Sequence, residues 1–269
     1  MRIREIKKSA LQVLKGRWGQ AVIVALGYLI VMAAFSIAQR ILGGNPGAAS
    51  QADLQSVLLK VHTMTPAAAV VSLVEFFVLP PLTYGIVASY IRFTEGEKVG
   101  IFDYITYGFK HYGKSWAVMW WPFLRLLGWI VLMFVFLAVF LVAVTLSSAS
   151  QIAPAAGTAV AIIAAVIFIA LLVVIIVKGL LYSATAYVMF KSGNALKGRA
   201  ATEKSAAMMN GSRCKYFLLN LSFIGWALLA IITIGIGFLW LLPYIEVSCI
   251  ILFKWLENNS SPASGGERV

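Results

Sequence analysis

The sequence predicts an all-α protein: a polytopic membrane helical bundle of six transmembrane helices in three hairpins, with amphipathic helices at the cytoplasmic interface. The first observation is composition, because 61% of the 269 residues are hydrophobic, only 12% are charged, and the mean hydropathy is +0.90. A soluble domain carries about 25% charged residues, so this chain has too few to cover a water-facing surface. The second observation is the length of the apolar runs, and the third is the placement of the positive charges.

Six apolar runs approach or exceed the roughly 20 residues that a helix needs to cross about 30 Å of hydrocarbon. The expected spans are residues 21–42, 67–93, 126–146, 158–177, 217–234 and 238–256. Strands of a membrane barrel alternate polar and apolar residues, whereas these runs are apolar on every side. Each run is therefore expected to be a helix.

Most of the 22 lysines and arginines fall on one side of the membrane if the N-terminus is cytoplasmic. Only Arg40 and Lys60 then lie outside, and Arg125 and Lys178 lie within apolar runs. Positively charged cytoplasmic segments orient membrane helices, so both termini are expected in the cytoplasm. The same charges favour anionic lipid head groups as partners. Nucleic acid is disfavoured, because no aromatic and basic recognition motif accompanies them.

The first residues of the chain predict an amphipathic helix at the membrane surface. Ile3, Ile6, Ala10 and Leu14 recur at helical spacing, and basic residues occupy the other positions. Such a helix places its apolar stripe in lipid and its cations against phosphates. The residues expected to bind head groups are Arg4, Lys7, Lys8, Lys15 and Arg17.

A short pattern occurs three times: a tyrosine, a small residue four positions later, apolar residues and then a cation. It begins at Tyr84, Tyr182 and Tyr244. Basic segments precede the first, third and fifth spans at similar intervals. Internal repeats of this kind indicate a repeated structural unit. We therefore expect one membrane domain over 1–257, with pseudo-repeats 1–93, 101–191 and 195–257, followed by a disordered cytoplasmic tail over 258–269.

Each of these tyrosines follows residues that can break a helix: Pro80 and Pro81, Gly179, and Pro243. Carbonyl groups freed at membrane depth must be satisfied by neighbours, side chains or water. Three breaks that meet inside the bundle would form a polar pocket. The alternative is that the prolines and small residues serve close helix packing. The sequence leaves both interpretations open.

Ionisable side chains within the spans are costly in hydrocarbon and mark candidate functional sites. For Arg125 and Lys178 the alternative is that they are anchors whose charged ends reach the membrane surface. With the three tyrosines, these side chains form the candidate ligand-binding set. Its members are Glu246, Tyr244, Tyr84, Tyr182, Glu75, Lys178 and Arg125.

Catalytic and metal-binding motifs are not found in the sequence. It has no GxSxG, HExxH or P-loop pattern, and the spacing of Cys214 and Cys249 suggests neither a metal site nor a structural disulfide. His62 and His111 are expected on opposite sides of the membrane. We expect no cofactor, no metal and no enzymatic activity.

Residues 221–256, LSFIGWALLAIITIGIGFLWLLPYIEVSCIILFKWL, resemble the C-terminal signature of a bacterial integral-membrane family catalogued as domain of unknown function 975. The matching residues are Phe223, Gly225, Trp226, Thr233, Gly235, Gly237, Leu239, Pro243 and Tyr244. ALQVLKGRWGQAV, residues 10–22, is similar to the family's N-terminal stretch. The resemblance implies a multi-pass protein of the bacterial cytoplasmic membrane, without assigned catalytic residues. Larger membrane proteins with similar hairpins are attached to lipid-degrading phosphodiesterases, which implies a link to lipids.

These observations together predict non-enzymatic handling of a lipid-like or amphiphilic molecule, by binding or transport, in the bundle interior. The alternative is a scaffold or regulatory subunit of a membrane protein complex, with a membrane protein as partner. A cavity that opens to lipid or water would favour the first function, and a solid bundle would favour the second. The sequence does not indicate an oligomeric state.

Overall fold

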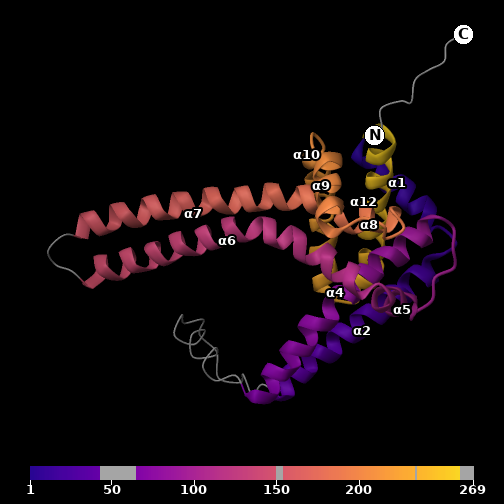
Figure 1. Cartoon of the computed structure of the whole chain (residues 1–269), viewed down its shortest axis with the longest axis horizontal. Coiled ribbons are helices and arrows are strands. Elements are labelled where there is room, and N and C mark those ends of the chain that lie inside the picture. Colours follow the sequence, from indigo (N-terminus) through magenta and orange to yellow (C-terminus); the bar gives the residue numbers. More distant parts are fainter. Residues whose placement is uncertain (43–64, 150–153, 234, 261–269) are drawn as a thin grey trace, which may run out of the picture. The chain divides into compact units, whose positions relative to one another are not determined.

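The computed structural model describes residues 1–42, 65–149, 154–233 and 235–260. The regular elements within these ranges are all helices, which confirms the predicted all-α class (Figure 1). In chain order they are α1 (Ile3–Leu14), α2 (Trp18–Leu42), α4 (Pro66–Thr94), α5 (Asp103–Lys110), α6 (Tyr112–Ala149), α7 (Pro154–Tyr182), α8 (Thr185–Lys191), α9 (Gly198–Met209), α10 (Arg213–Leu221), α11 (Ile224–Ile232) and α12 (Phe238–Ser260).

Six helical stretches in the described part of the chain are long and apolar enough to cross a membrane, as predicted. They are Trp18–Leu42, Pro66–Thr94, Tyr112–Thr145, Ala156–Lys191, Arg213–Ile232 and Phe238–Asn259. Each overlaps one of the predicted apolar runs, and several extend beyond it because the helix continues into more polar sequence. Of the predicted tail over 258–269, residues 258–260 belong to α12. The remainder of the tail and the connection at 43–64 lie outside the described residues.

The fourth of these stretches is interrupted, but not where the sequence indicated. The break expected at Gly179 is wrong, because α7 continues through this residue and ends at Tyr182. The next helix, α8, begins at Thr185. At the break, the Ser205 hydroxyl donates a hydrogen bond of 2.9 Å to the Leu181 carbonyl oxygen. A side chain of α9 thus satisfies a carbonyl group where the regular helix stops.

The described chain forms two compact units. The first contains residues 1–116 and 219–255, and the second contains 117–218 together with the C-terminal segment from 256. The first unit therefore combines α1, α2, α4 and α5 with α11 and α12. The second contains most of α6 and the helices α7 to α9.

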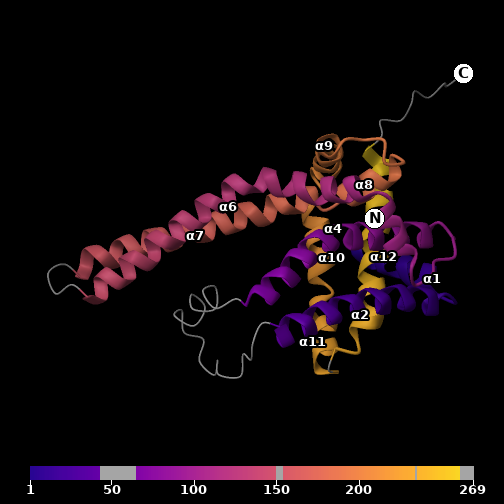
Figure 2. The same cartoon turned by 60° about the horizontal axis from the view of Figure 1, so that its bottom comes forward.

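Two antiparallel helices, α2 and α4, form part of the first unit and lie side by side (Figures 1 and 2). Near the start of α2, the Tyr90 hydroxyl donates to the Ala21 carbonyl oxygen at 3.0 Å. Near its end, the Gln39 side chain donates to the Ser72 hydroxyl at 2.8 Å. Hydrogen bonds at both ends define the register of the pair.

The short helix α5 packs closely against α4. A Cβ atom at Gly85 would overlap the Tyr104 carbonyl oxygen, and one at Gly108 would overlap the Pro81 carbonyl oxygen. Glycine on each helix therefore allows backbone to approach backbone. Within α4, the buried prolines thus lie at a helix crossing, which favours packing over a polar pocket at these residues.

A carbonyl group that a proline frees in α4 has a partner within the same unit. Pro81 has no N–H, so it cannot donate to the Phe77 carbonyl oxygen four residues earlier. That oxygen instead accepts a hydrogen bond of 3.2 Å from the Tyr112 hydroxyl. α4 thus continues through both prolines, and the carbonyl group that Pro81 frees is satisfied by a side chain.

The apolar stripe of α1 is buried within the first unit rather than exposed to lipid. Ile6, Ala10 and Leu14 are each 0% exposed, so the expectation that this stripe enters the lipid is wrong. Gly16, with φ of +77°, makes the turn into α2. This conformation favours glycine because it lacks a Cβ atom.

The end of α4 is tied to its neighbours by cationic side chains. Arg17 donates to the Phe93 carbonyl oxygen at 3.1 Å and also to the Glu97 carbonyl oxygen. Lys254 of α12 donates to the Thr94 hydroxyl at 2.9 Å and lies 3.8 Å from Glu95. These contacts join the ends of three helices of the first unit.

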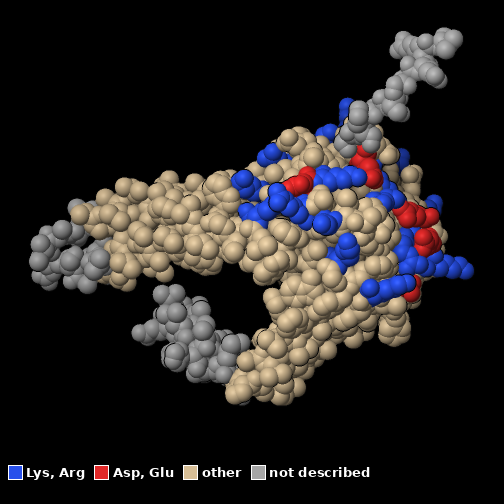
Figure 3. All heavy atoms as spheres, viewed as in Figure 1, with Lys and Arg blue, Asp and Glu red and all other residues tan. Residues whose placement is uncertain are grey.

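In the second unit, α6 and α7 lie side by side, and α9 packs against α7 and α8. Gly198, at the start of α9, meets the Trp121 ring so closely that a larger residue would displace it. The turn after α9 is formed by Asn210 and by Gly211, with φ of +80°. Figure 3 shows lysines and arginines gathered near α9, whereas the α6–α7 pair beyond this region shows no charge.

Candidate functional site

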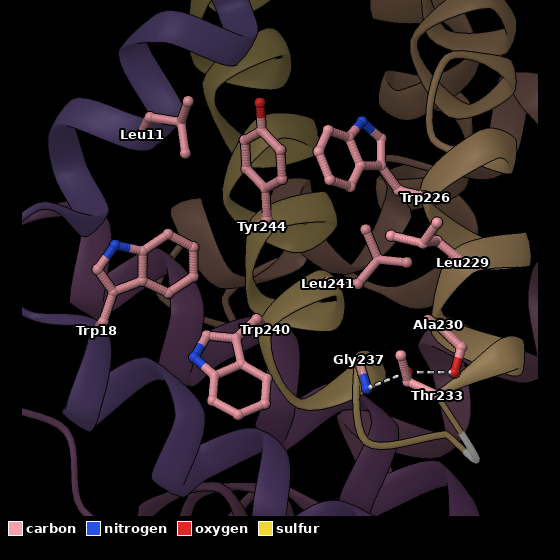
Figure 4. A pocket seen from close by; sticks show the side chains of 10 residues that line it. All are labelled: Leu11, Trp18, Trp226, Leu229, Ala230, Thr233, Gly237, Trp240, Leu241 and Tyr244. Carbon is pink, nitrogen blue, oxygen red and sulfur yellow. Dashed lines mark hydrogen bonds between the residues drawn. The ribbon is translucent and has the colours of Figure 1, made fainter.

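A pocket of about 470 Å³ lies in the first unit and is open at one side (Figure 4). The helices α1, α2, α11 and α12 contribute its lining, together with Thr233 and Gly237 between α11 and α12. The lining residues are Leu11, Trp18, Trp226, Leu229, Ala230, Thr233, Gly237, Trp240, Leu241 and Tyr244. Pockets that bind small molecules have a volume of about 300–1,000 Å³ and are mostly apolar, so this pocket has the size and character of a ligand site.

The tight turn between α11 and α12 forms one end of the pocket. The Thr233 hydroxyl donates to the Ala230 carbonyl oxygen at 2.9 Å and accepts from the Gly237 N–H at 3.2 Å. A Cβ atom at Gly237 would lie 2.8 Å from the Ala230 Cα atom. Glycine is therefore needed for α11 and α12 to approach this closely.

Aromatic side chains make up much of the wall. Trp18, Trp226 and Trp240 come from three different helices, and Tyr244 lies among them. Trp240 is 49% exposed, so the aromatic wall reaches the surface of the unit. The ring of the buried Phe223 meets the Tyr244 ring edge to face at a centroid distance of 5.0 Å. This ring contact holds Tyr244 in place.

The pocket offers few polar atoms to a ligand. The Thr233 hydroxyl is already engaged in the turn. The Tyr244 hydroxyl makes no hydrogen bond to any described residue, and its oxygen points along the pocket, away from Trp240 (Figure 4). Among the described residues, no group of three or more histidine, cysteine or acidic side chains could hold a metal ion. An apolar chain with a small polar head would suit this lining best.

Of the predicted site residues in the first unit, only Tyr244 lines the pocket. Tyr84 is buried, with its ring 5.9 Å from that of Tyr107 in α5. Glu75 is half-buried in α4. The structure therefore does not gather the predicted tyrosines and carboxyl groups around one pocket.

Glu246 lies in α12 but is not among the residues that line the pocket. It is half-buried, and the hydroxyl groups of Tyr28 and Tyr90 lie within electrostatic range of its carboxyl group. Its neighbours thus come from α2 and α4. Glu246 therefore lies near α2 and α4, whereas Trp240 and Leu241 of the same helix line the pocket.

The other predicted site residues belong to the second unit. The Arg125 guanidinium lies 2.5 Å from a Glu203 carboxylate oxygen and 5.9 Å from the centre of the Tyr182 ring. The Lys178 ammonium lies 5.2 Å from the centre of the Trp129 ring. Both cations therefore have partners within this unit, and Arg125 joins α6 to α9.

The predicted head-group residues near the N-terminus fall into two classes. Arg4, Lys8 and Lys15 are exposed, as a membrane-surface role requires. Lys7 instead donates to the Ser222 carbonyl oxygen at 3.0 Å and lies over the Phe223 ring at 4.1 Å. Burial lowers the pKa of Lys7, because the charged form loses part of its hydration.

The sequence interpretation missed Trp18, Trp226 and Trp240 as site residues. Trp18 and Trp240 are far apart in the chain, so no local pattern connects them. A signal was available in the C-terminal signature, however. Several of the residues that carry the family resemblance line the pocket: Trp226, Thr233, Gly237 and Tyr244.

Comparison with known proteins gives a match at the level of the family. No curated protein and no solved structure matches the chain. A family model matches residues 1–260. Because this match covers nearly the whole chain, the protein belongs to the family described as Protein of unknown function (DUF975).

Proposed function

We propose that this membrane protein binds a lipid-like or amphiphilic molecule, with the apolar chain of the ligand in the pocket of the first unit. The observation that carries the proposal is the lining, which combines three tryptophans and one tyrosine with leucine and alanine around about 470 Å³. Burial of apolar surface contributes about 25 cal/mol per Å², so an alkyl chain gains affinity from contact with this lining. The half-exposed Trp240 would give such a ligand a lateral entry.

We further propose that the protein binds or transports this ligand without chemical conversion. The lining residues include no carboxylate, histidine or cysteine. Groups of this kind are the commonest in acid–base and nucleophilic catalysis, and the Thr233 hydroxyl of the lining is already engaged in the turn. The Tyr244 hydroxyl is suited to positioning a polar head by a hydrogen bond.

The test uses an alkanol that carries a photoreactive diazirine on its chain, added to the protein in phosphatidylcholine nanodiscs. Labels should concentrate on residues 224–244. Trp240→Ala removes one wall and should reduce this labelling about tenfold, as expected when an aromatic contact is lost. Trp120→Ala is the matched control, because Trp120 is similarly exposed but lies in the second unit. Uniform labelling of all apolar helices, insensitive to Trp240→Ala, would contradict the proposal.

A second candidate function, that of a scaffold, is favoured by the α6–α7 pair. A shallow groove between these helices is lined by small and branched residues, namely Val135, Ala138, Val139, Val142, Ala143, Ala156, Gly157 and Val160. Small residues allow helices to approach closely in membranes. The occupant would be a transmembrane helix of another membrane protein.

The scaffold function is tested by a photoreactive amino acid at position 139, within this groove. Position 131 is the control, because Val131 is exposed on the same helix and does not line the groove. A protein adduct of defined mass from position 139 alone would support a docked helix. Lipid adducts from both positions would count against it.

A further inference from the structure

We propose that the ligand of this pocket carries an acidic head group, and that Lys7 of α1 binds it at the end of the pocket where the Tyr244 hydroxyl lies. This inference rests on the proposed binding function. It names the chemical class of the ligand, an alkyl chain that ends in a carboxylate or a phosphate. It also gives roles to Lys7, Tyr244 and Trp226.

The position of Lys7 follows from the geometry of α1. Leu11 lines the pocket, and Lys7 precedes it by four residues, so both side chains lie on the same face of the helix. The Lys7 ammonium lies 4.1 Å from the centre of the Phe223 ring. That ring in turn lies 5.0 Å from the ring of Tyr244. The Lys7 ammonium and the Tyr244 ring thus contact the same aromatic side chain.

Lys7 retains hydrogen-bonding capacity for a ligand. An ammonium group has three N–H donors, and the Ser222 carbonyl oxygen accepts one of them at 3.0 Å. No carboxylate of a described residue is paired with Lys7. Burial also lowers its pKa, and an anionic head group would supply the missing counter-charge.

The polar atoms at this end of the pocket are suited to a ligand head group that accepts hydrogen bonds. In Figure 4 the Tyr244 oxygen, the Trp226 indole nitrogen and Leu11 lie at the same end of the pocket, opposite Trp240 and Gly237. The indole N–H is a donor only, and a phenol can donate as well. Neither group makes a hydrogen bond to a described residue. Two donors beside a cation favour a carboxylate or a phosphate over a neutral or cationic head.

The rest of α1 adds positive charge to this region. Arg4 and Lys8 are exposed on the same helix. The acidic residue of α1, Glu5, accepts from the Arg2 backbone N–H at 2.8 Å and caps the helix start. The local field therefore favours an anion, while only Lys7 is held against the wall of the pocket.

The experiment compares three diazirine probes with the same alkyl chain and different heads: a carboxylic acid, a phosphate and an alcohol. In phosphatidylcholine nanodiscs, half-maximal labelling of residues 224–244 should need about tenfold less of an acidic probe than of the alcohol, because hydrogen bonds to a charged group are the stronger ones. The acid and phosphate arms show which head is preferred. Lys7→Gln should abolish the difference between the acidic probes and the alcohol.

Two further variants keep the test decisive. Lys8→Gln removes a neighbouring charge from the exposed face of α1 and should retain the preference. Tyr244→Phe removes one donor without changing the ring, and should reduce the preference several-fold even if Lys7→Gln impairs folding. Melting temperatures identify any variant that is destabilised.

The outcomes separate the head-group inference from the proposed function. If all three probes label residues 224–244 at equal concentrations, the head-group inference is overturned while the pocket stands. An equal loss of preference in Lys7→Gln and Lys8→Gln would replace a site at Lys7 with general surface charge. If no probe labels these residues above the level of the other helices, the binding function itself fails.

Discussion

A carboxylate of α9, that of Glu203, binds two arginines and thereby joins α9 to α6 in the second unit. Glu203 accepts from Arg199 at 3.1 Å and from Arg125 at 2.5 Å. The hydrogen bond from Arg199 has the largest effect, followed by that from Arg125. Both lower the pKa of Glu203 because they stabilise its ionised form. The sequence marked Arg125 as a ligand candidate or a snorkelling anchor. It could not show Glu203 as the partner, because the two lie far apart in the chain and meet only when α9 packs.

The shared carboxylate predicts a dependence of stability on pH. A carboxyl group whose pKa is lower in the folded state contributes stability above its unfolded pKa, about 4.5. This contribution is lost as the pH falls from there through the folded value. Glu203→Gln should lower the melting temperature slightly at pH 7, since exposed ion pairs contribute little. Below the folded pKa, the variant and the parent should melt alike.

Arg199→Gln serves as the control for this prediction. It retains the contact between Arg125 and Glu203, so at pH 7 its melting temperature should fall less than that of Glu203→Gln. Thermal melting in detergent at several pH values measures all three proteins. A constant difference between Glu203→Gln and its parent across this pH range would contradict the assignment.

Glycines form the crossing between α4 and α5 at the scale of secondary structure. Close helix packing was one of the two roles that the sequence left open for the prolines and small residues near the tyrosines, and the structure shows close packing at Gly85. Its partner could not be predicted, because α5 is a short helix outside the apolar runs. The break at Gly179 was misplaced for a related reason: a glycine permits a helix to end but does not require it.

Substitution of these glycines should show how tight the crossing is. Gly85→Ala and Gly108→Ala each place a Cβ atom on a backbone carbonyl group of the other helix. Forced backbone shifts typically cost about 1–3 kcal/mol, so the melting temperature should fall clearly. Gly128→Ala in α6 is the control, because a Cβ atom added there would meet no atom within 4 Å. It should leave stability unchanged or raise it by up to about 1 kcal/mol. Equal melting of all three variants would show that the crossing is looser than described.

At the scale of the whole molecule, the structure has the helical class and the six candidate spans that the sequence predicted. The residues that line the pocket differ from the predicted site residues. Apolar runs predict membrane helices well, because hydrocarbon imposes one length on all of them. They do not predict which faces meet, since lipid and a neighbouring helix are equally apolar surroundings. The pocket combines Trp18 with Trp226 and Trp240, and its composition therefore could not be derived from span order alone.

Orientation in the membrane is a prediction for the whole chain, and cysteine labelling tests it. With Cys214 replaced by serine, Ser50→Cys should react with an impermeant reagent from outside the cell. Ser264→Cys should react only after permeabilisation, because positively charged segments stay in the cytoplasm. The reverse pattern would invert the topology, and labelling of both sites from outside would exclude an even number of spans.

The burial of α12 has a consequence for synthesis and membrane insertion. Half of its most apolar window, 50%, is buried inside the protein, against 6% for the stretch that begins at Tyr112. The α6 stretch can enter the bilayer by its own hydrophobicity, whereas α12 carries Pro243 and Glu246 and is synthesised after the other described helices. Ionisable residues make spontaneous insertion costly. Insertion of α12 should therefore depend on the N-terminal helices that receive it, and the pocket would be completed only after α12 has joined them.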